Sequence, residues 1–466
     1  MPVFQRSSLL MIPRLLAFIL LPLSLVAAVA AQDTRTVIEP ILPEVCTTLD
    51  AHLQTAGSSL PPADEQMLDT ARIQKAINRC GKYRAVLLHV DETANAFLTG
   101  PLELKPHVTL IVGPGVTLFA SRDPALYATS PGSCGIVSHT PGPRGCKPLI
   151  SADHAPGSGI MGDGVIDARG GEKMLGSPYS WWDLAEQARA GGGQQVPRII
   201  VADYSDDFTL YRITLKNSPN FHVVYDHGDG FTVWGLKIDT PQRLARNTDG
   251  VDPGDGARNV TITHSYIRTG DDNVAIKGGA GGAANITVSH DHFYWGHGMS
   301  IGSETNGGVS KIRVFDLSLD GPDNGIRIKS NGSRGGLTQD VVYDDVCIRN
   351  SPNPITFDTG YTAAGTLQGN SPPSMRDITL KDVRISGGGK FSFNGYAKDY
   401  RIAATLDGVQ ITDDAKYTYS LHHADLTLGP DPTNLHFPAG EDSTVTGTPA
   451  EGHPASCQEK FAPFPQ

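Results

Sequence analysis

Four short motifs that carry ionisable side chains follow one another along the chain. They are Asn247-Thr248-Asp249-Gly250, Gly270-Asp271-Asp272-Asn273, the run from Gly296 to Ser303 with His297 inside it, and Arg327-Ile328-Lys329. Together they supply three carboxylates, one imidazole and two cations. Carboxylates held close together cannot all ionise easily, so one of them keeps a proton at mildly acidic pH. Such a set can supply an acid and a base for one reaction.

The spacing of the motifs indicates how they are brought together. They are separated by about 22, 26 and 30 residues, the length of one unit in a stacked solenoid. Neighbouring strands of such a stack lie about 4.8 Å apart. We therefore expect Asp249 one rung from the Asp271-Asp272 pair, with Lys329 roughly 14 Å further along. Arg327 and Lys329 are two residues apart, so on a strand they share a face.

Short β-rich segments with a common apolar pattern recur from Val108 onward, with turn residues between them. Steps of about 23 to 37 residues suit large coils with one variable loop each, and they predict an all-β right-handed parallel β-helix. A propeller would need about 40 to 45 residues per blade, and a sandwich would show hairpin turns inside its repeats. The corresponding apolar positions are Phe208, Phe231, Val260, Ile286, Ile312, Val341, Ile378 and Ala404.

One clear helix is predicted from Asp69 to Cys80. Ile73, Ala76 and Ile77 recur at helical spacing behind capping residues. A solenoid needs a cap over the open end of its core, so we expect this short N-terminal helix to be that cap.

Composition supports a single large domain. The chain has 466 residues, and only 19% of them are charged. A solenoid can use such a length as one domain. The net charge of −11 gives no overall basic field for nucleic acid, so an acidic ligand would need a local cationic patch.

Residues 1–31 are typical of a secretory signal peptide. Arg6 and Arg14 precede an apolar run, and small residues end at Ala31. A membrane anchor is the alternative, but Pro22 and Ser24 interrupt a run that is short for a span. We expect export, either to the medium or through the periplasm in transit. Residues 32–466 would then form the mature domain, with an irregular tail at about 429–466.

The six cysteines suit an oxidising compartment, and the sequence alone permits fifteen pairings. Their spacing with histidine does not fit a zinc site, so we expect no structural metal.

The four motifs, in this order and at these distances, resemble the polygalacturonase family, glycoside hydrolase family 28, and most closely its secreted bacterial endopolygalacturonases. The resemblance extends from about residue 35 to roughly residue 419 and includes Ser180-Trp181-Trp182 and Ser218 to His222. It implies hydrolysis of α-1,4 bonds in de-esterified pectin with inversion of configuration. It also implies the bridges Cys46–Cys80 and Cys134–Cys146, which leaves Cys347 and Cys457 either bridged or free.

The same resemblance assigns roles to residues. Asp271 would be the general acid, Asp249 and Asp272 would activate water, and His297 would support the acid. For both neighbouring aspartates to face one groove the chain must bend, which Gly270 allows.

Substrate binding is expected at four positions. Arg327 and Lys329 would hold galacturonate carboxylates. Tyr361 matches a family tyrosine near the cleaved sugar, and Asn247 lies in the first motif. Asp252 is interpreted as structural.

Several alternatives remain open at this point. The enzyme could cleave at chain ends if a loop near 183–197 closed one end of the groove. It could also hydrolyse another pectin backbone. A calcium-dependent pectate lyase would need clustered carboxylates for calcium and a basic residue. A β-helical adhesin would not need converging aspartates. We expect no cofactor, no metal, no membrane or nucleic-acid partner, and a monomer that binds polygalacturonate.

Overall fold

The computed structural model describes residues 1–3, 32–140, 142–362 and 369–465. Residues 31–466 form one compact unit. Nearly all strand pairings in its described part are parallel, and successive coils stack into a right-handed parallel β-helix, as predicted. The signal-peptide prediction falls almost entirely on residues outside the described part, so it stays a prediction.

One sheet of the solenoid has 11 strands in the described residues, and it carries the ionisable motifs. Its strands, in stacking order, are β4 (Leu102–Glu103), β8 (Ile150–Asp153), β12 (Ile200–Asp203), β15 (Val223–Asp226), β18 (Val251–Pro253), β21 (Val274–Ile276), β23 (Met299–Ile301), β25 (Asn324–Lys329), β27 (Asn353–Asp358), β29 (Gly389–Asn394) and β32 (Tyr417–His422).

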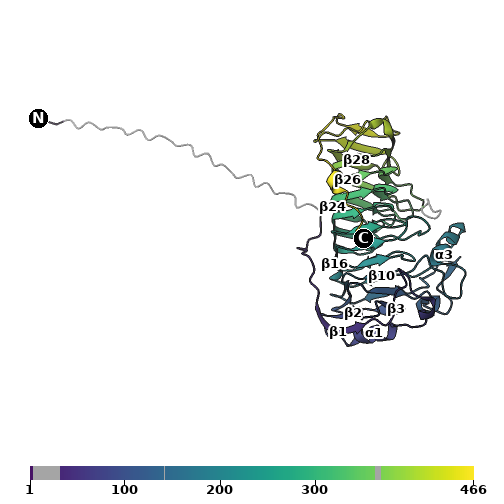
Figure 1. Ribbon diagram of the computed structural model, residues 1–466. Coiled ribbons are helices and arrows are strands. Elements are labelled where there is room, and N and C mark those ends of the chain that lie inside the picture. The colour runs from purple at the N-terminus through teal and green to yellow at the C-terminus, as the bar shows by residue number, and fades with distance from the viewer. Residues whose placement is uncertain (4–31, 141, 363–368, 466) are drawn as a thin grey trace. The chain divides into compact units, whose positions relative to one another are not determined.

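The remaining parallel strands form a second, larger sheet, which Figure 1 shows stacked from β2 beside α1 to β28. Its strands are β1 (Glu44–Asp50), β2 (Arg84–His89), β3 (Ala96–Thr99), β5 (Val108–Val112), β6 (Thr117–Ala120), β9 (Gly159–Met161), β10 (Val165–Asp167), β13 (Phe208–Tyr211), β14 (Thr214–Lys216), β16 (Asp229–Trp234), β17 (Lys237–Asp239), β19 (Arg258–Thr263), β20 (Tyr266–Arg268), β22 (Ala283–Phe293), β24 (Val309–Asp320), β26 (Leu337–Arg349), β28 (Ser374–Ser386), β30 (Ile402–Asp407), β31 (Gln410–Ile411), β33 (Ala424–Leu428) and β34 (Thr444–Thr446).

The apolar positions that recur in the sequence stack directly on one another. Phe208 pairs with Phe231, which pairs with Val260, and the ladder continues through Ile286 and Ile312. These side chains are fully buried. β-branched and aromatic residues pack well on such a pleated, buried surface, and like residues on successive rungs fill the interior at constant width. This column fixes the register of every coil, because a slip of one residue would turn its apolar side chains outward.

Helix α1 (Thr70–Arg79) lies at the predicted position, with Asp69 and Cys80 as its flanking caps. Its buried face covers the first coils, so the predicted capping helix is confirmed. Two further helices, α2 (Pro124–Tyr127) and α3 (Trp181–Gln187), were not predicted. A capping box between Ser180 and Asp183 begins α3, which is short and sits in what the apolar pattern indicates as a loop.

The loop after α3 is folded against the rest of the molecule. Strand β11 (Gly193–Gln195) pairs antiparallel with β7 (Ile136–Ser138), and the bridge Cys134–Cys146 closes the loop that holds β7. Among the described residues, no helix is long and apolar enough to cross a membrane.

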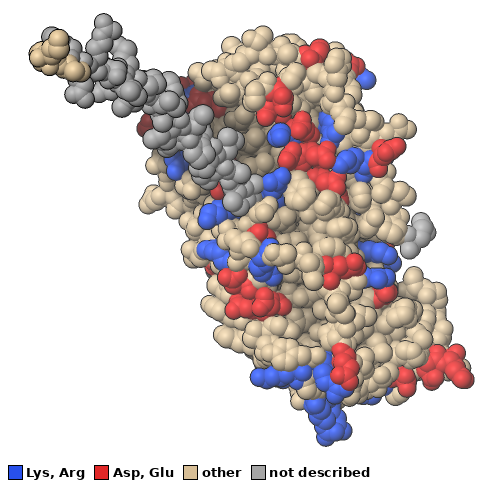
Figure 2. Space-filling model, turned by 90° about the vertical axis from the view of Figure 1, so that its left-hand side faces the viewer, with Lys and Arg blue, Asp and Glu red and all other residues tan. Residues whose placement is uncertain are grey.

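Charged side chains on the outer surface are mixed in sign. Figure 2 shows Lys and Arg interspersed with Asp and Glu over the face that it presents, without one continuous basic area.

All six cysteines are paired. The bridges Cys46–Cys80 and Cys134–Cys146 are as the family resemblance implies, and Cys347 and Cys457 form the third. This third bridge ties the tail to β26 across a sequence separation of 110 residues.

Removing the third bridge should destabilise the protein more than removing the second. The chain-entropy account gives a larger gain for a longer loop, so the loss for Cys347→Ala with Cys457→Ala should exceed that for Cys134→Ala with Cys146→Ala by about 2 kcal/mol. Denaturant unfolding of both variants measures the difference. An equal or smaller loss at the long bridge would contradict this view of the tail.

Candidate active site

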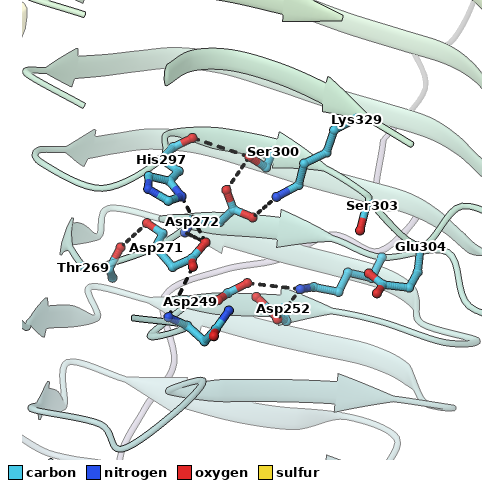
Figure 3. A network of polar contacts seen from close by, with 12 residues as sticks. Asp249, Asp252, Thr269, Asp271, Asp272, His297, Ser300, Ser303, Glu304 and Lys329 are labelled. Atoms are coloured by element: carbon cyan, nitrogen blue, oxygen red, sulfur yellow. Dashed lines mark hydrogen bonds and ion pairs between the residues drawn. The ribbon is translucent and has the colours of Figure 1, made fainter. Parts of the chain in front are cut away.

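The ionisable motifs occupy successive rungs of the 11-stranded sheet. Asp249 precedes β18, Asp271 and Asp272 precede β21, and His297 precedes β23. The pairings Val251 with Val274 and Val274 with Met299 place the three motifs in one column. The predicted rung order is therefore what the structure has, and Figure 3 shows Asp249 one strand away from Asp271 and Asp272.

A bend at Gly270 lets neighbouring aspartates serve the same site. A Cβ at Gly270 would lie 2.1 Å from the carbonyl oxygen of Ala245, so only glycine fits where the chain turns. The backbone N–H of Asp272 donates to Oδ1 of Asp271 at 2.9 Å, which holds the two carboxylates in different directions. Figure 3 shows Asp271 turned toward His297 and Asp272 toward Ser300 and Lys329.

Asp272 is buried and surrounded by donors. Arg327 Nη2 donates to Oδ1 at 3.0 Å, Lys329 Nζ to Oδ2 at 2.7 Å, and Ser300 Oγ to Oδ1 at 2.7 Å. Burial alone would raise the pKa of Asp272, but the two cations outweigh it and hold the pKa below its usual range. Asp272 is therefore a fixed negative charge.

Asp271 forms an ion pair with His297. Nδ1 of His297 lies 3.1 Å from Oδ1 of Asp271, and Nε2 lies 3.5 Å from Asp323. Burial would lower the pKa of His297, yet its hydrogen bonds to Asp271 and Asp323 raise it to about 10. Burial would raise the pKa of Asp271, but His297, Lys329 and Arg327 together hold it well below the usual range. The pair shares one titratable proton, and that proton is on the ring of His297.

Asp249 is in a different electrostatic environment. Lys277 Nζ lies 3.0 Å from Oδ2 of Asp249 and 3.1 Å from Oδ2 of Asp252, so one cation serves two buried carboxylates. Burial raises the pKa of Asp249 well above its usual value, and Lys277 opposes that rise. Burial also raises the pKa of Asp252, to about 7. The highest carboxylate pKa values of the site are thus on the rung of Asp249.

Lys329 lies three rungs beyond Asp249, which agrees with the predicted distance of about 14 Å along the stack. Its side chain leans back across two rungs to contact Asp272. The sequence did not predict this reach of the side chain. Tyr361 lies near both cations, with its ring centre 5.6 Å from Cζ of Arg327 and 5.0 Å from Nζ of Lys329.

Asn247 lies beside Asp271 and is itself contacted by the segment that follows α3. The backbone N–H of Asn247 donates to Oδ2 of Asp271 at 3.3 Å, and Gln194 Nε2 donates to Oδ1 of Asn247 at 3.1 Å. Gln194 belongs to β11, so the segment near 183–197 contacts the first motif at Asn247.

Sequence reasoning missed two participants. Lys277 was not singled out, and it directly follows β21, the strand that the Asp271-Asp272 motif precedes. Asp252 was interpreted as structural, and it shares Lys277 with Asp249. No motif in the sequence marks this contact, which arises because β18 stacks on β21.

Asp271, Asp272 and His297 each offer one ligand atom within 4.8 Å of the others, as a metal site would. The chemistry of the set does not favour a metal, because Asp272 already contacts two cationic side chains. A divalent ion would have to bind against those charges.

Comparisons with known proteins identify the family of this chain. The profile of glycosyl hydrolases family 28 matches residues 113–427. The chain belongs to this family of glycoside hydrolases. It is 43% identical to an endo-polygalacturonase of Pectobacterium carotovorum subsp. carotovorum over 84% of this chain and 92% of the relative. A polygalacturonase of Ralstonia nicotianae is 38% identical over 92% of each chain.

Solved structures have the same fold. A polygalacturonase from Erwinia carotovora ssp. carotovora has a TM-score of 0.76 at 41% identity, over 84% of this chain and 99% of that one. A family 28 exopolygalacturonase from Yersinia enterocolitica has a TM-score of 0.65 at 20% identity, over 88% of this chain and 79% of that one, and shares the fold.

The ion pair of His297 can be tested by titration. Replacing Asp271 by asparagine removes the charge that holds the ring proton, so the pKa of His297 should fall from about 10 by about 1 to 3 units. NMR of the ring protons measures it, with the signal assigned from His297→Gln. Asp316→Asn, which removes the partner of His290, is the matched control and should leave His297 unchanged. An unshifted His297 in Asp271→Asn would disprove the pair.

Proposed function

We propose that this protein is an endo-polygalacturonase that hydrolyses α-1,4 bonds between galacturonate residues of de-esterified pectin. The observation that carries the proposal is the column of Asp249, Asp271 and Asp272 on successive rungs, flanked by Arg327 and Lys329. Both cations pair with Asp272, and their charge also suits a polysaccharide that carries carboxylates. The identity of 43% to an endo-polygalacturonase over most of both chains supports the same reaction.

The general acid is assigned to Asp271. Protonating the leaving oxygen requires a proton at this carboxylate, and the pair with His297 holds one. A substrate carboxylate bound nearby adds negative charge, which raises the pKa of both members and favours the protonated pair. In the reaction the His297 ring passes its Nδ1 proton to Asp271 across the 3.1 Å contact and becomes neutral, and Asp271 gives that proton to the glycosidic oxygen.

The base is assigned to Asp249 with Asp272. In an inverting hydrolysis a water attacks the anomeric carbon opposite the leaving oxygen and loses its proton to a carboxylate. Asp272 contacts two cations and is a weak base. Asp249 has the higher pKa, so it is the stronger base of the two once ionised. We therefore give Asp249 the proton of the water and Asp272 the task of orienting it.

The ring of Tyr361 lies near both Arg327 and Lys329. Both cations contact Asp272, and a galacturonate carboxylate that binds here competes with Asp272 for the same donors. Methyl esterification removes that negative charge, so esterified residues lose the ion pair. Selection for de-esterified pectin follows from this competition.

Cleavage within the chain, rather than at its end, is supported by the identity of 43% to an endo-polygalacturonase over 92% of that relative. The loop near 183–197 contacts Asn247 through Gln194. The exo mode, another pectin backbone and a calcium-dependent lyase are the outcomes that the assay must separate.

The assay follows polygalacturonate with chelator present. We expect new reducing ends, no ultraviolet absorbance from unsaturated products, and a viscosity that falls early in the reaction. Reducing ends with slow loss of viscosity would indicate end-wise attack. Absorbance that chelator abolishes would indicate a lyase and overturn the hydrolytic mechanism.

Replacing Asp271 by alanine should leave binding of polygalacturonate intact and lower kcat by about 100-fold to 10,000-fold, because general acid catalysis contributes on that order. Reducing-end release and affinity electrophoresis measure the two properties separately. Asp316→Ala, an aspartate paired with a histidine outside the column, is the matched control. Retained cleavage in Asp271→Ala would remove Asp271 from the mechanism.

A further inference from the structure

Lys277 is a half-buried cation, its side chain 18% exposed, that contacts two buried carboxylates. Its ammonium contacts Asp249 at 3.0 Å and Asp252 at 3.1 Å, and it lies 4.4 Å from the ring centre of Phe221. It directly follows β21, the strand that Asp271 and Asp272 precede. The lysine therefore joins the rung of the acid to the rung of the base.

The contact is directional. Lys277 binds Oδ2 of Asp249, whereas Oδ1 of the same carboxylate is buried and has no hydrogen-bond donor among the described residues. A buried oxygen without a donor costs free energy unless a ligand or water completes it. Lys277 occupies Oδ2, so Oδ1 is the oxygen of Asp249 whose acceptor capacity the described residues leave unused.

We propose that Lys277 is a positioning residue that holds Asp249 ionised and turned so that Oδ1 takes the proton of the attacking water. The inference rests on the proposed hydrolytic function. It assigns a role to a residue outside the four motifs.

Lys277 has the largest opposing effect on the pKa of Asp249. Burial and the neighbouring carboxylates raise this pKa, and Lys277 is the cation in direct contact with Asp249 that lowers it. Asp252 competes for the same ammonium, so the two carboxylates titrate as a set. The charged groups that act on Asp249 or Lys277 from the surrounding elements are Arg198, Asp252, Asp271, Asp272, Glu304 and Arg327.

Two substitutions should move the pH profile in opposite directions. Lys277→Gln removes the cation, so the pKa of Asp249 rises and the acidic limb of kcat should move up by about 1 to 3 pH units. Asp252→Asn removes the competing carboxylate, so Asp249 keeps Lys277 to itself and the acidic limb should move down. Lys277→Arg restores a positive charge and should return the limb toward that of the unaltered protein.

The experiment measures kcat for polygalacturonate from acidic to neutral pH for the full chain and each variant. Lys216→Gln, which removes a lysine 3.6 Å from Asp239 outside the site, is the matched control and should leave the profile unchanged. Thermal unfolding of each variant identifies the pH range in which it is folded, and profiles are compared within that range.

Each outcome decides the proposal. Opposite shifts of the acidic limb support it. A shift of the basic limb in Lys277→Gln would make Asp249 the acid and overturn it, and so would an acidic limb that does not move in either variant. Should Lys277→Gln not fold, the downward shift in Asp252→Asn decides alone. An unaltered protein without hydrolytic activity would instead refute the proposed function, so the two failures are distinguishable.

Discussion

The parallel, in-register pairing of short strands is the constraint on which the site depends. Each coil adds one rung about 4.8 Å from the last, and the buried column through Phe231 and Val260 prevents any coil from slipping. Residues at equivalent positions of successive coils must therefore stand side by side. Aspartates placed at those positions are forced into contact distances that their mutual repulsion would otherwise oppose.

That repulsion explains the cations of the site. Asp249 and Asp252 share Lys277, Asp272 has Arg327 and Lys329, and Asp271 has His297. Removing one partner of a buried pair leaves an uncompensated charge, which is strongly destabilising. The unequal distribution is what creates function, because it separates the pKa values of chemically identical groups. Asp272 contacts two cations and stays ionised, whereas Asp249 shares one lysine with Asp252 and can take and lose a proton.

The sequence predicted those parts of the structure that follow from the repeat length of the coils. The recurring apolar positions stack as the repeat length indicates, and the rung order of the motifs follows from the same count. Side-chain reach does not follow from it. Lys329 contacts Asp272 across two rungs because a lysine side chain is long and flexible, and position along the stack says nothing of its direction. The pairing of Cys347 with Cys457 likewise depends on how the tail folds back, which carries no periodic signal.

Lys277 and α3 were missed for different reasons. Lys277 has no motif around it, and its importance arises from Asp249 and Asp252 on the neighbouring rung. Helix α3 begins at a local capping box, but its seven residues are too few for a periodic pattern to identify. Neither the contacts of Lys277 nor the helical conformation of α3 follows from the repeat pattern of the sequence.

The central claim is that an acid and a base act on opposite sides of one bond with a water between them. NMR of the first products from polygalacturonate tests it most directly, because the anomer formed reports the direction of attack. The account predicts that the new reducing ends appear as the β anomer and then equilibrate with the α anomer. Initial formation of the α anomer would show retention and would contradict the roles given to Asp249 and Asp271.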